Sequence, residues 1–453
     1  MSTVIFMPFH WASDINSTFA LARKLRNRGH RVIYLCIPDV EQRIRAQGLD
    51  FIPIFDRVFP QGSIAEYDAR QARGEDTGTR TFEARFEGMC EDLRKGEIEK
   101  SMKGIQADLF LTSSGMPWVG IAATRMGVPV ISFSSTLISV FDSRVPPFRS
   151  DSMPPESLYS RIRVFVTWQA LFLRRWLFPR VSISPGLKAL ARSCNYPVDR
   201  IDFKVETWPR LLMPELVFCP EDFDFPRTKN PDGAYFVEAS IDTERSDTQF
   251  PVERLIEGRP LIYCTLGTVV TVSHPQRAGA FFQMFMDMMN QMPECQAIVV
   301  LGNHLKIDDF NPPENVLVVN EAPQIGILAR ASLMVSHGGI GGVKEATFMG
   351  VPMILIPLFY DQPGNAARVV YHGLGERLPL KRLNAPELSK LIHKVIEDPS
   401  YGANVKAMSK KFRAVEEQTP SIEIIEKALN HQLPDPPEKQ EPQAFSDRAG
   451  QSR

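Results

Sequence analysis

The segment whose residues are best suited to binding or catalysis covers residues 336–375, SHGGIGGVKEATFMGVPMILIPLFYDQPGNAARVVYHGLG. Four glycines between positions 338 and 342 follow an apolar run and precede a segment with the apolar spacing of a helix. Glycines at a strand-to-helix turn let backbone N–H groups and the positive end of the helix approach a phosphate group closely. A tight turn that binds nothing has the same spacing, so the glycines by themselves leave both interpretations open.

Alternating strands and helices position this segment and the N-terminal part of the chain. Residues 4–9 predict a strand, residues 16–28 a helix that Gly29 ends, and residues 31–37 a second strand, which together form a β-α-β unit with parallel strands. The alternation continues with a strand at 107–112, a helix at 117–126 and a strand at 128–133. This pattern is typical of an open α/β sheet.

A second alternating series begins at residues 259–268 and includes the glycine-rich turn. Its expected members are a helix at 276–291, strands at 297–301, 315–319, 331–336 and 351–357, and a helix from residue 361. The sequence therefore predicts an α/β protein of two doubly wound domains that face each other across a ligand-binding cleft.

Composition and charge exclude several other classes of protein. With 52 Lys and Arg against 53 Asp and Glu, the net charge of −1 gives no global positive field, so nucleic acid is not an expected partner. The six cysteines are scattered without a C-x-x-C pair or metal-ligand spacing, which is typical of thiols in a reducing compartment. We find no signal peptide and no apolar stretch of about 20 residues, and expect a soluble cytoplasmic chain without a transmembrane segment.

Residues 336–375 resemble the donor-binding signature of the family 1 UDP-glycosyltransferases, two-domain enzymes of the GT-B fold. The resemblance includes the His and glycines of the turn, GVPM at 350–353, and the Asp-Gln pair at 361–362. Weaker similarity extends over most of the chain, for example APQ at 322–324 and TLGT at 265–268. Within the family, its motifs most resemble those of bacterial enzymes that glycosylate lipophilic natural products, including carotenoids.

The resemblance implies a nucleotide-sugar site on the second domain and no cofactor or metal. In it, His337 donates to the α-phosphate, Glu345 accepts from the ribose hydroxyls, Asp361 and Gln362 hold the sugar, and Thr268 reaches the diphosphate from the opposite loop. The complete expected donor site consists of Thr268, Ala322, Gln324, His337, Gly339, Gly341, Gly342, Glu345, Asp361 and Gln362.

Three positions depart from the family pattern. Glu321 stands where an aromatic residue usually stacks on uracil, and Gly342 replaces a Ser or Thr, so UDP and dTDP both stay open as the nucleotide. Asp14 occupies the place of the usual catalytic His, with Ser113 or Ser114 where that His would have a carboxylate partner. We expect Asp14 to be the general base, with His10 as the rival.

The resemblance implies an inverting hexosyltransferase that moves a sugar from UDP-sugar, or dTDP-sugar, to a hydroxyl of a lipophilic small molecule. The alternative is a catalytically silent nucleotide-sugar-binding protein that activates another transferase. Aromatic and apolar residues near the expected cleft, namely Phe9, Trp11, Met116 and Trp118, are the candidate acceptor-binding residues. The triplet DFD at 222–224 matches the cation-binding D-x-D of another glycosyltransferase fold, but its place in a Pro-rich connection favours a loop.

The expected domains are an acceptor domain at 1–235, a linker at 236–256 and a donor domain at 257–415. A C-terminal helix at 416–432 should pack back on the first domain, and a disordered tail should follow at 433–453. The aromatic and basic segment 160–180 has two interpretations, a helix that contacts a membrane surface weakly and a helix packed on the first domain. The second interpretation is favoured.

Overall fold

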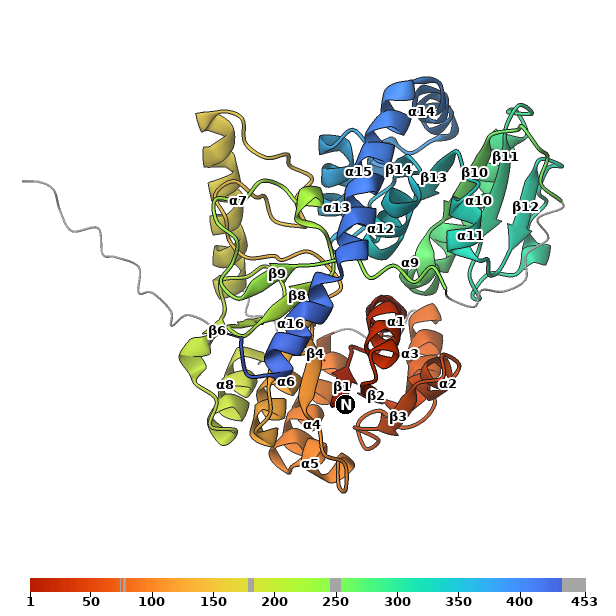
Figure 1. The fold of residues 1–453 in the computed structure, drawn as a ribbon. Coiled ribbons are helices and arrows are strands. Elements are labelled where there is room, and N and C mark those ends of the chain that lie inside the picture. Colours follow the sequence, from red (N-terminus) through yellow and green to blue (C-terminus); the bar gives the residue numbers. More distant parts are fainter. Residues whose placement is uncertain (74, 76–78, 178–182, 245–253, 434–453) are drawn as a thin grey trace, which may run out of the picture.

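The first domain is built on a parallel seven-stranded sheet of order β3-β2-β1-β4-β5-β8-β9 (Figure 1). The computed structural model describes residues 1–73, 75, 79–177, 183–244 and 254–433. The strands are β1 (Thr3–Met7), β2 (Arg31–Cys36), β3 (Asp50–Pro53), β4 (Leu109–Ser113), β5 (Val130–Ser134), β8 (Glu215–Val217) and β9 (Ala234–Phe236). Strands β1, β2 and β4 are almost completely buried, because helices cover the sheet and leave no polar face.

Helices and one small hairpin complete this domain. The helices are α1 (Ala12–Asn27), α2 (Glu41–Arg45), α3 (Ser63–Ala72), α4 (Thr79–Arg94), α5 (Glu97–Ser101), α6 (Pro117–Ala123), α7 (Leu158–Leu177) and α8 (Ile183–Ser193). The hairpin pairs β6 (Ile201–Asp202) with β7 (Arg210–Leu211). Helix α1 begins four residues before the predicted start, so Asp14 lies in its first turn, where a carboxylate is favourable to the helix dipole.

The second domain is built on a parallel six-stranded sheet of order β12-β11-β10-β13-β14-β15. Its strands are β10 (Leu261–Thr265), β11 (Gln296–Val300), β12 (Val316–Val319), β13 (Leu333–Ser336), β14 (Met353–Leu355) and β15 (Gly375–Arg377). Its helices are α9 (Gly267–Ser273), α10 (Pro275–Met289), α11 (Gln324–Leu328), α12 (Ile340–Met349), α13 (Gln362–Tyr371) and α14 (Ala385–Glu397). Two parallel doubly wound sheets confirm the predicted fold class.

The C-terminal helices connect the two domains a second time (Figure 1). Helix α15 (Pro399–Gln418) packs on α12 of the second domain, and α16 (Pro420–Leu429) packs on α1 of the first. Ile422 and Ile425 of α16 are buried in the same apolar cluster as the first sheet. The first domain therefore owes part of its core to the end of the described chain.

The structure refines the segment boundaries predicted from the sequence. Strand β9 ends at Phe236, so the expected domain boundary at residue 235 falls inside the last strand of the first sheet. Residues 245–253 of the expected linker, and residues 434–453 of the expected disordered tail, lie outside the described residues.

Candidate active site

One cleft of about 2730 Å³ lies between the domains, at the carboxyl ends of strands from both sheets. Its lining combines the two sets of residues that the sequence predicts on separate domains. From the first domain it includes Phe9, His10, Trp11, Asp14 and Met116, and from the second Ala322, Gln324, His337, Gly339, Gly341, Gly342, Glu345, Asp361 and Gln362. Both sets therefore face one volume, as a reaction between two substrates requires.

The glycine-rich turn places the N-terminus of α12 at this cleft. Gly339 is the N-cap residue with an extended backbone, and the first turn contains no acidic side chain. The N–H groups at the start of a helix have no partner within the helix, and Gly341 and Gly342 leave them uncovered by side chains. This end of α12 can therefore bind an anionic group through backbone N–H groups and the helix dipole.

The ring of His337 lies between Gly267, at the start of α9, and Gly339, at the start of α12. A Cβ atom on Gly267 would lie 2.5 Å from Cε1 of His337, and one on Gly339 would lie 2.6 Å from its Nε2. Burial lowers the pKa of His337 to about 4, so the ring is neutral at pH 7 and carries one N–H donor. Among the described residues, Nδ1 of His337 has no hydrogen-bond partner. A buried ring with an unused nitrogen at a helix N-terminus is well suited to contact a ligand oxygen.

A chain of hydrogen bonds fixes the carboxylate of Glu345 one turn along α12. Nε2 of Gln324 donates to Oε2 of Glu345 at 2.5 Å, and the hydroxyl of Tyr263 donates to Oε1 of Gln324 at 2.9 Å. Tyr263 is buried in β10, so the chain holds Glu345 against the sheet. Sequence analysis identified Gln324 and Glu345 but not Tyr263.

Asp361 and Gln362 lie at the other end of the glycine turn, at the start of α13. Oδ2 of Asp361 accepts a bond from Nδ2 of Asn365 at 3.0 Å, and burial raises the pKa of Asp361. Oε1 of Gln362 accepts from the backbone N–H groups of Leu358 at 2.8 Å and Phe359 at 3.1 Å. The side chain of Asp361 makes no capping bond to α13, although this residue is the N-cap.

The structure describes the side chain of Ala322, one of the expected donor residues, but not that of Thr268. Ala322 lines the cleft beside Glu321, whose Oε1 accepts from Nδ2 of Asn303 at 2.7 Å. A hydrogen-bonded carboxylate thus occupies the place where the family has an aromatic ring. The side chain of Thr268 lies outside the described part of the structure. Its neighbour Gly267 lines the cleft.

Asp14 faces the donor residues from the first domain. Its Oδ2 accepts from the N–H of Phe9 and its Oδ1 from Oγ of Ser135, both at 2.7 Å. Burial raises the pKa of Asp14, although bonds from Ser135, Phe9 and Ser113 and the charge of Lys344 each oppose that rise. A carboxylate with a raised pKa is a stronger base than an exposed aspartate.

His10, the rival for the role of base, has a less suitable environment. Its ring stacks on Phe9 with centroids 4.4 Å apart and lies against Phe59. Burial and the nearby charge of Arg85 lower the pKa of His10 to about 4. That value makes the imidazole a weaker base than an ordinary histidine.

Lys344 is a functional candidate that sequence analysis missed. This buried residue of α12 donates from Nζ to the carbonyl oxygens of Phe218 at 2.7 Å and Ser135 at 3.2 Å, both in the first domain. Because Ser135 also bonds Asp14, two hydrogen bonds connect the helix of the donor site to the candidate base. No motif contains this connection, since the contact is 209 residues apart in sequence.

Comparisons with known proteins agree with this geometry. Residues 223–418 match the family model of the UDP-glucoronosyl and UDP-glucosyl transferases. This segment contains the whole second sheet and the glycine-rich turn. The protein is a glycosyltransferase whose residues 223–418 match this family.

Relatives and solved structures match far more of the chain. An NDP-glycosyltransferase of Bacillus subtilis is 24% identical over 88% of this chain and 90% of its own length. The zeaxanthin glucosyltransferase of Pantoea ananas is 24% identical over 82% of each chain. The crystal structure of the calicheamicin glycosyltransferase CalG4 superposes with a TM-score of 0.66 at 18% identity, covering 96% of this chain and 100% of that one. The glycosyltransferase therefore has the GT-B fold.

Three of the four expected acceptor residues of the glycosyltransferase line the cleft, and Trp118 does not. Phe9 and Met116 line the cleft, and Trp11 reaches across it to Tyr360 of the second domain, with ring centroids 6.5 Å apart. Trp118 is fully buried and does not line the cleft. As the second residue of α6 it turns into the core, where its ring contacts Phe86 and Trp208.

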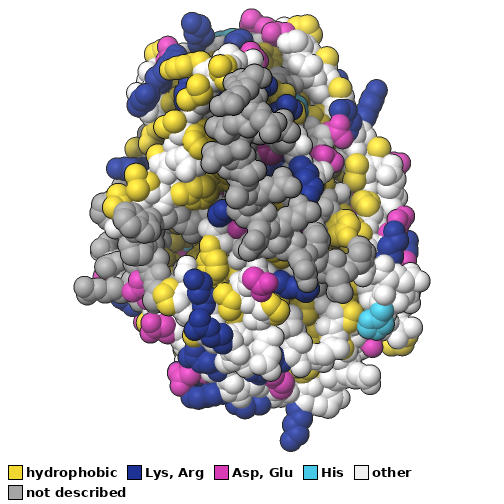
Figure 2. Space-filling model, turned by 90° about the vertical axis from the view of Figure 1, so that its left-hand side faces the viewer, with side chains coloured by type: hydrophobic (Ala, Val, Ile, Leu, Met, Phe, Trp, Pro, Cys, Tyr) yellow, Lys and Arg dark blue, Asp and Glu magenta, His cyan; other side chains and the backbone are white. Residues whose placement is uncertain are grey.

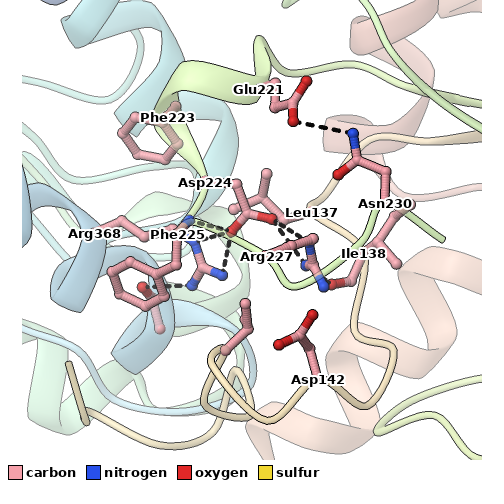
Figure 3. Close-up of polar contacts among 12 residues, drawn as sticks. Leu137, Ile138, Asp142, Glu221, Phe223, Asp224, Phe225, Arg227, Asn230 and Arg368 are labelled. Carbon is pink, nitrogen blue, oxygen red and sulfur yellow. Dashed lines mark hydrogen bonds and ion pairs between the residues drawn. The ribbon is translucent and has the colours of Figure 1, made fainter. Parts of the chain in front are cut away.

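The DFD triplet has a structural role in this glycosyltransferase. Asp224 is buried and pairs with Arg368 of α13 and with Arg227, as Figure 3 shows. Burial alone would raise the pKa of Asp224, but the charges of both guanidinium groups outweigh it and the pKa is lowered. Asp222 instead forms an exposed pair with Lys411. The two carboxylates thus pair with different Arg and Lys side chains, which agrees with the interpretation of DFD as part of a loop.

Proposed function

We propose that this glycosyltransferase moves a hexose from UDP-sugar, or dTDP-sugar, to a hydroxyl of a lipophilic small molecule, with inversion at the anomeric carbon. The single observation that supports the proposal best is the placement of Asp14 and the N-terminus of α12 on opposite walls of one cleft. A base and an anion-binding site on opposite sides of the reacting carbon are what an in-line displacement needs.

In the proposed reaction, the acceptor hydroxyl gives its proton to Asp14 as its oxygen attacks the anomeric carbon. The bond between that carbon and the diphosphate breaks on the opposite face, so the configuration inverts. Negative charge then grows on the diphosphate, where the N–H groups of Gly341 and Gly342 and the neutral ring of His337 stabilise it. Glu345 orients the ribose, and Asp361 and Gln362 hold the sugar hydroxyls.

The lipophilic acceptor is inferred from the cleft and from the relatives. The first-domain part of the lining contains aromatic and apolar side chains such as Phe9, Trp11, Met116 and Phe172. Such a surface favours a ligand with a large apolar area and few polar groups. The names of the matched relatives, a zeaxanthin glucosyltransferase and a calicheamicin glycosyltransferase, agree with a natural product of this kind.

The proposal is tested by measuring UDP release from UDP-glucose with a panel of lipophilic alcohols and phenols. Release that depends on an acceptor, with a β-linked product from the α-linked donor, supports it. Binding of UDP without release for any acceptor or nucleotide sugar would instead support a silent partner that activates another transferase.

A further inference from the structure

Helix α7 has two apolar faces, of which the described residues cover only one. Val164 and Trp168 are buried, and Nε1 of Trp168 donates to the carbonyl of Val145 at 2.8 Å. The same ring lies against Phe141, with centroids 5.7 Å apart. The helix is thus held firmly on the first domain, as the favoured interpretation of this segment predicts.

The opposite face of α7 is also apolar and is exposed. Ile162, Val166 and Leu173 are 54%, 55% and 55% exposed, and they share one side of the helix because their spacing follows its period. The full exposed stripe consists of Leu158, Tyr159, Ile162, Phe165, Val166, Leu173 and Leu177. A helix that is apolar on nearly all sides is normally covered on all sides.

The charges of α7 are of one sign. Its sequence, LYSRIRVFVTWQALFLRRWL, contains four arginines and no acidic residue. Arg161, Arg163 and Arg174 are exposed. Figure 2 views the molecule from the side on which α7 lies and shows hydrophobic side chains among Lys and Arg side chains and some Asp and Glu side chains on this face. An apolar stripe flanked by arginines is complementary to a bilayer interface with anionic headgroups.

The exposed stripe continues into the cleft. Phe165 and Phe172 line the cleft, and Phe165 also belongs to the exposed stripe. An apolar path therefore runs from the outer face of α7 to the proposed acceptor region. Among the described residues, no helix is long and apolar enough to cross a membrane, so contact through this face would be peripheral.

We propose that the exposed face of α7 docks this glycosyltransferase on an anionic lipid bilayer, with the cleft opening toward the membrane. Ile162, Val166, Leu173 and their neighbours insert among the acyl chains near the headgroups, and the arginines contact the lipid phosphates. The link to a lipophilic acceptor rests on the proposed function, whereas the docking itself does not.

The test is co-sedimentation of the full chain with vesicles of phosphatidylglycerol and phosphatidylcholine, or of phosphatidylcholine alone. We expect binding to the anionic vesicles that weakens as salt is raised. The variant Ile162→Gln, Val166→Gln, Leu173→Gln should lose at least about a hundred-fold in binding, because each side chain gives up burial worth roughly a factor of ten. None of the three lines the cleft, so UDP release with a water-soluble acceptor should stay unchanged.

A matched control changes three exposed apolar side chains outside α7, Ile256→Gln, Ile307→Gln and Leu380→Gln. Their exposed fractions of 48%, 37% and 47% lie below those of the α7 set, and binding should not change. Arg161→Gln with Arg163→Gln should weaken binding to anionic vesicles only, by about five-fold for each arginine.

Three outcomes would overturn the docking proposal. In the first, the wild-type protein binds neither kind of vesicle. In the second, the α7 variant binds as well as the wild type. In the third, neither protein binds vesicles, and the wild type is a dimer whereas the α7 variant is a monomer. The last would mean that a second copy of the chain covers this face. A protein that binds vesicles but never releases UDP would leave docking supported and refute the proposed function.

Discussion

Replacing Asp14 by asparagine separates the charge of the candidate base from its shape. In the structure, one carboxylate oxygen accepts from the N–H of Phe9 and the other from Oγ of Ser135. The amide oxygen can keep the first bond, and the amide nitrogen can donate to Ser135, because a hydroxyl also accepts. Asp14→Asn therefore keeps both hydrogen bonds and removes only the basic oxygen.

The expected loss in kcat is about a hundred-fold to ten-thousand-fold, the usual range for a positioned general base. The stability of the folded state, in contrast, should not fall in this variant. Because burial raises the pKa of Asp14 above its unfolded value, ionisation of this group destabilises the folded state as pH rises through that pKa. The uncharged amide avoids this cost, so the melting temperature of Asp14→Asn at pH 7 should equal or exceed that of wild type.

The assay combines UDP release, calorimetry with UDP and thermal unfolding. UDP affinity should stay near the wild-type value, since Asp14 belongs to the first domain and the proposed nucleotide site to the second. The wild-type rate should fall on the acid side as Asp14 becomes protonated, at a pH above the ordinary aspartate pKa of about 3.9. His10→Gln, just before the same helix, is the matched control and should reduce the rate much less.

Full activity of Asp14→Asn together with inactivity of His10→Gln would refute the assignment and make His10 the base. Full activity of both variants would mean that deprotonation of the acceptor does not limit the rate, and the acceptor class would have to be reconsidered.

Further predictions concern the donor site, the link between the domains and the buried ion pair. His337→Ala should weaken UDP binding in calorimetry by about 1–3 kcal/mol, the value of a hydrogen bond to a charged group, and unchanged affinity would contradict its phosphate role. EDTA should leave UDP release intact, and its abolition with rescue by manganese would contradict a site built on N–H groups. Lys344→Met removes a positive charge that lowers the pKa of Asp14, so the acid limb of the pH–rate profile should move to higher pH. If the limb does not move, Lys344 does not influence Asp14 and has only a packing role. Asp224→Asn should lower the free energy of unfolding in urea by about 3–5 kcal/mol, against at most about 1 kcal/mol for the exposed Asp222→Asn. The lowered pKa of Asp224 means that its contribution is present above the unfolded pKa of about 4 and is lost as pH falls through the folded value.

Hydropathy and turn residues were enough to predict the alternating order of strands and helices. Strands such as β1, β4 and β13 are continuous apolar runs bounded by turn residues, and local pattern is strongest there. The start of α1 was predicted too late, because the polar residues Ser13 and Asp14 resemble a loop when only local composition is considered. Helix boundaries depend on capping and tertiary contacts that a local pattern does not contain.

The candidate site was predictable where its residues are close in sequence. His337 and Glu345 belong to the glycine-rich turn and the helix that follows it, and Asp361 lies at the start of the next helix, so all three fall within the segment that carries the family resemblance. Ser135 and Lys344 were missed because their contacts join segments far apart in sequence: Ser135 and Asp14 are 121 residues apart, and Lys344 and Ser135 are 209 residues apart. Trp118 was misassigned because a residue that follows a strand end can point either into the cleft or into the core, and only packing decides between them.

The return of α16 to the first domain affects the order in which the protein can fold during synthesis. The first sheet is translated early, but the apolar surface that Ile422 and Ile425 cover stays open until α16 leaves the ribosome. N-terminal domains generally fold first as the chain emerges, and exposed apolar surface on such an intermediate favours aggregation. The nascent first domain must therefore wait for the whole second domain before its core is closed. Cutting the gene between the two sheets would yield an N-terminal fragment with an unfinished core.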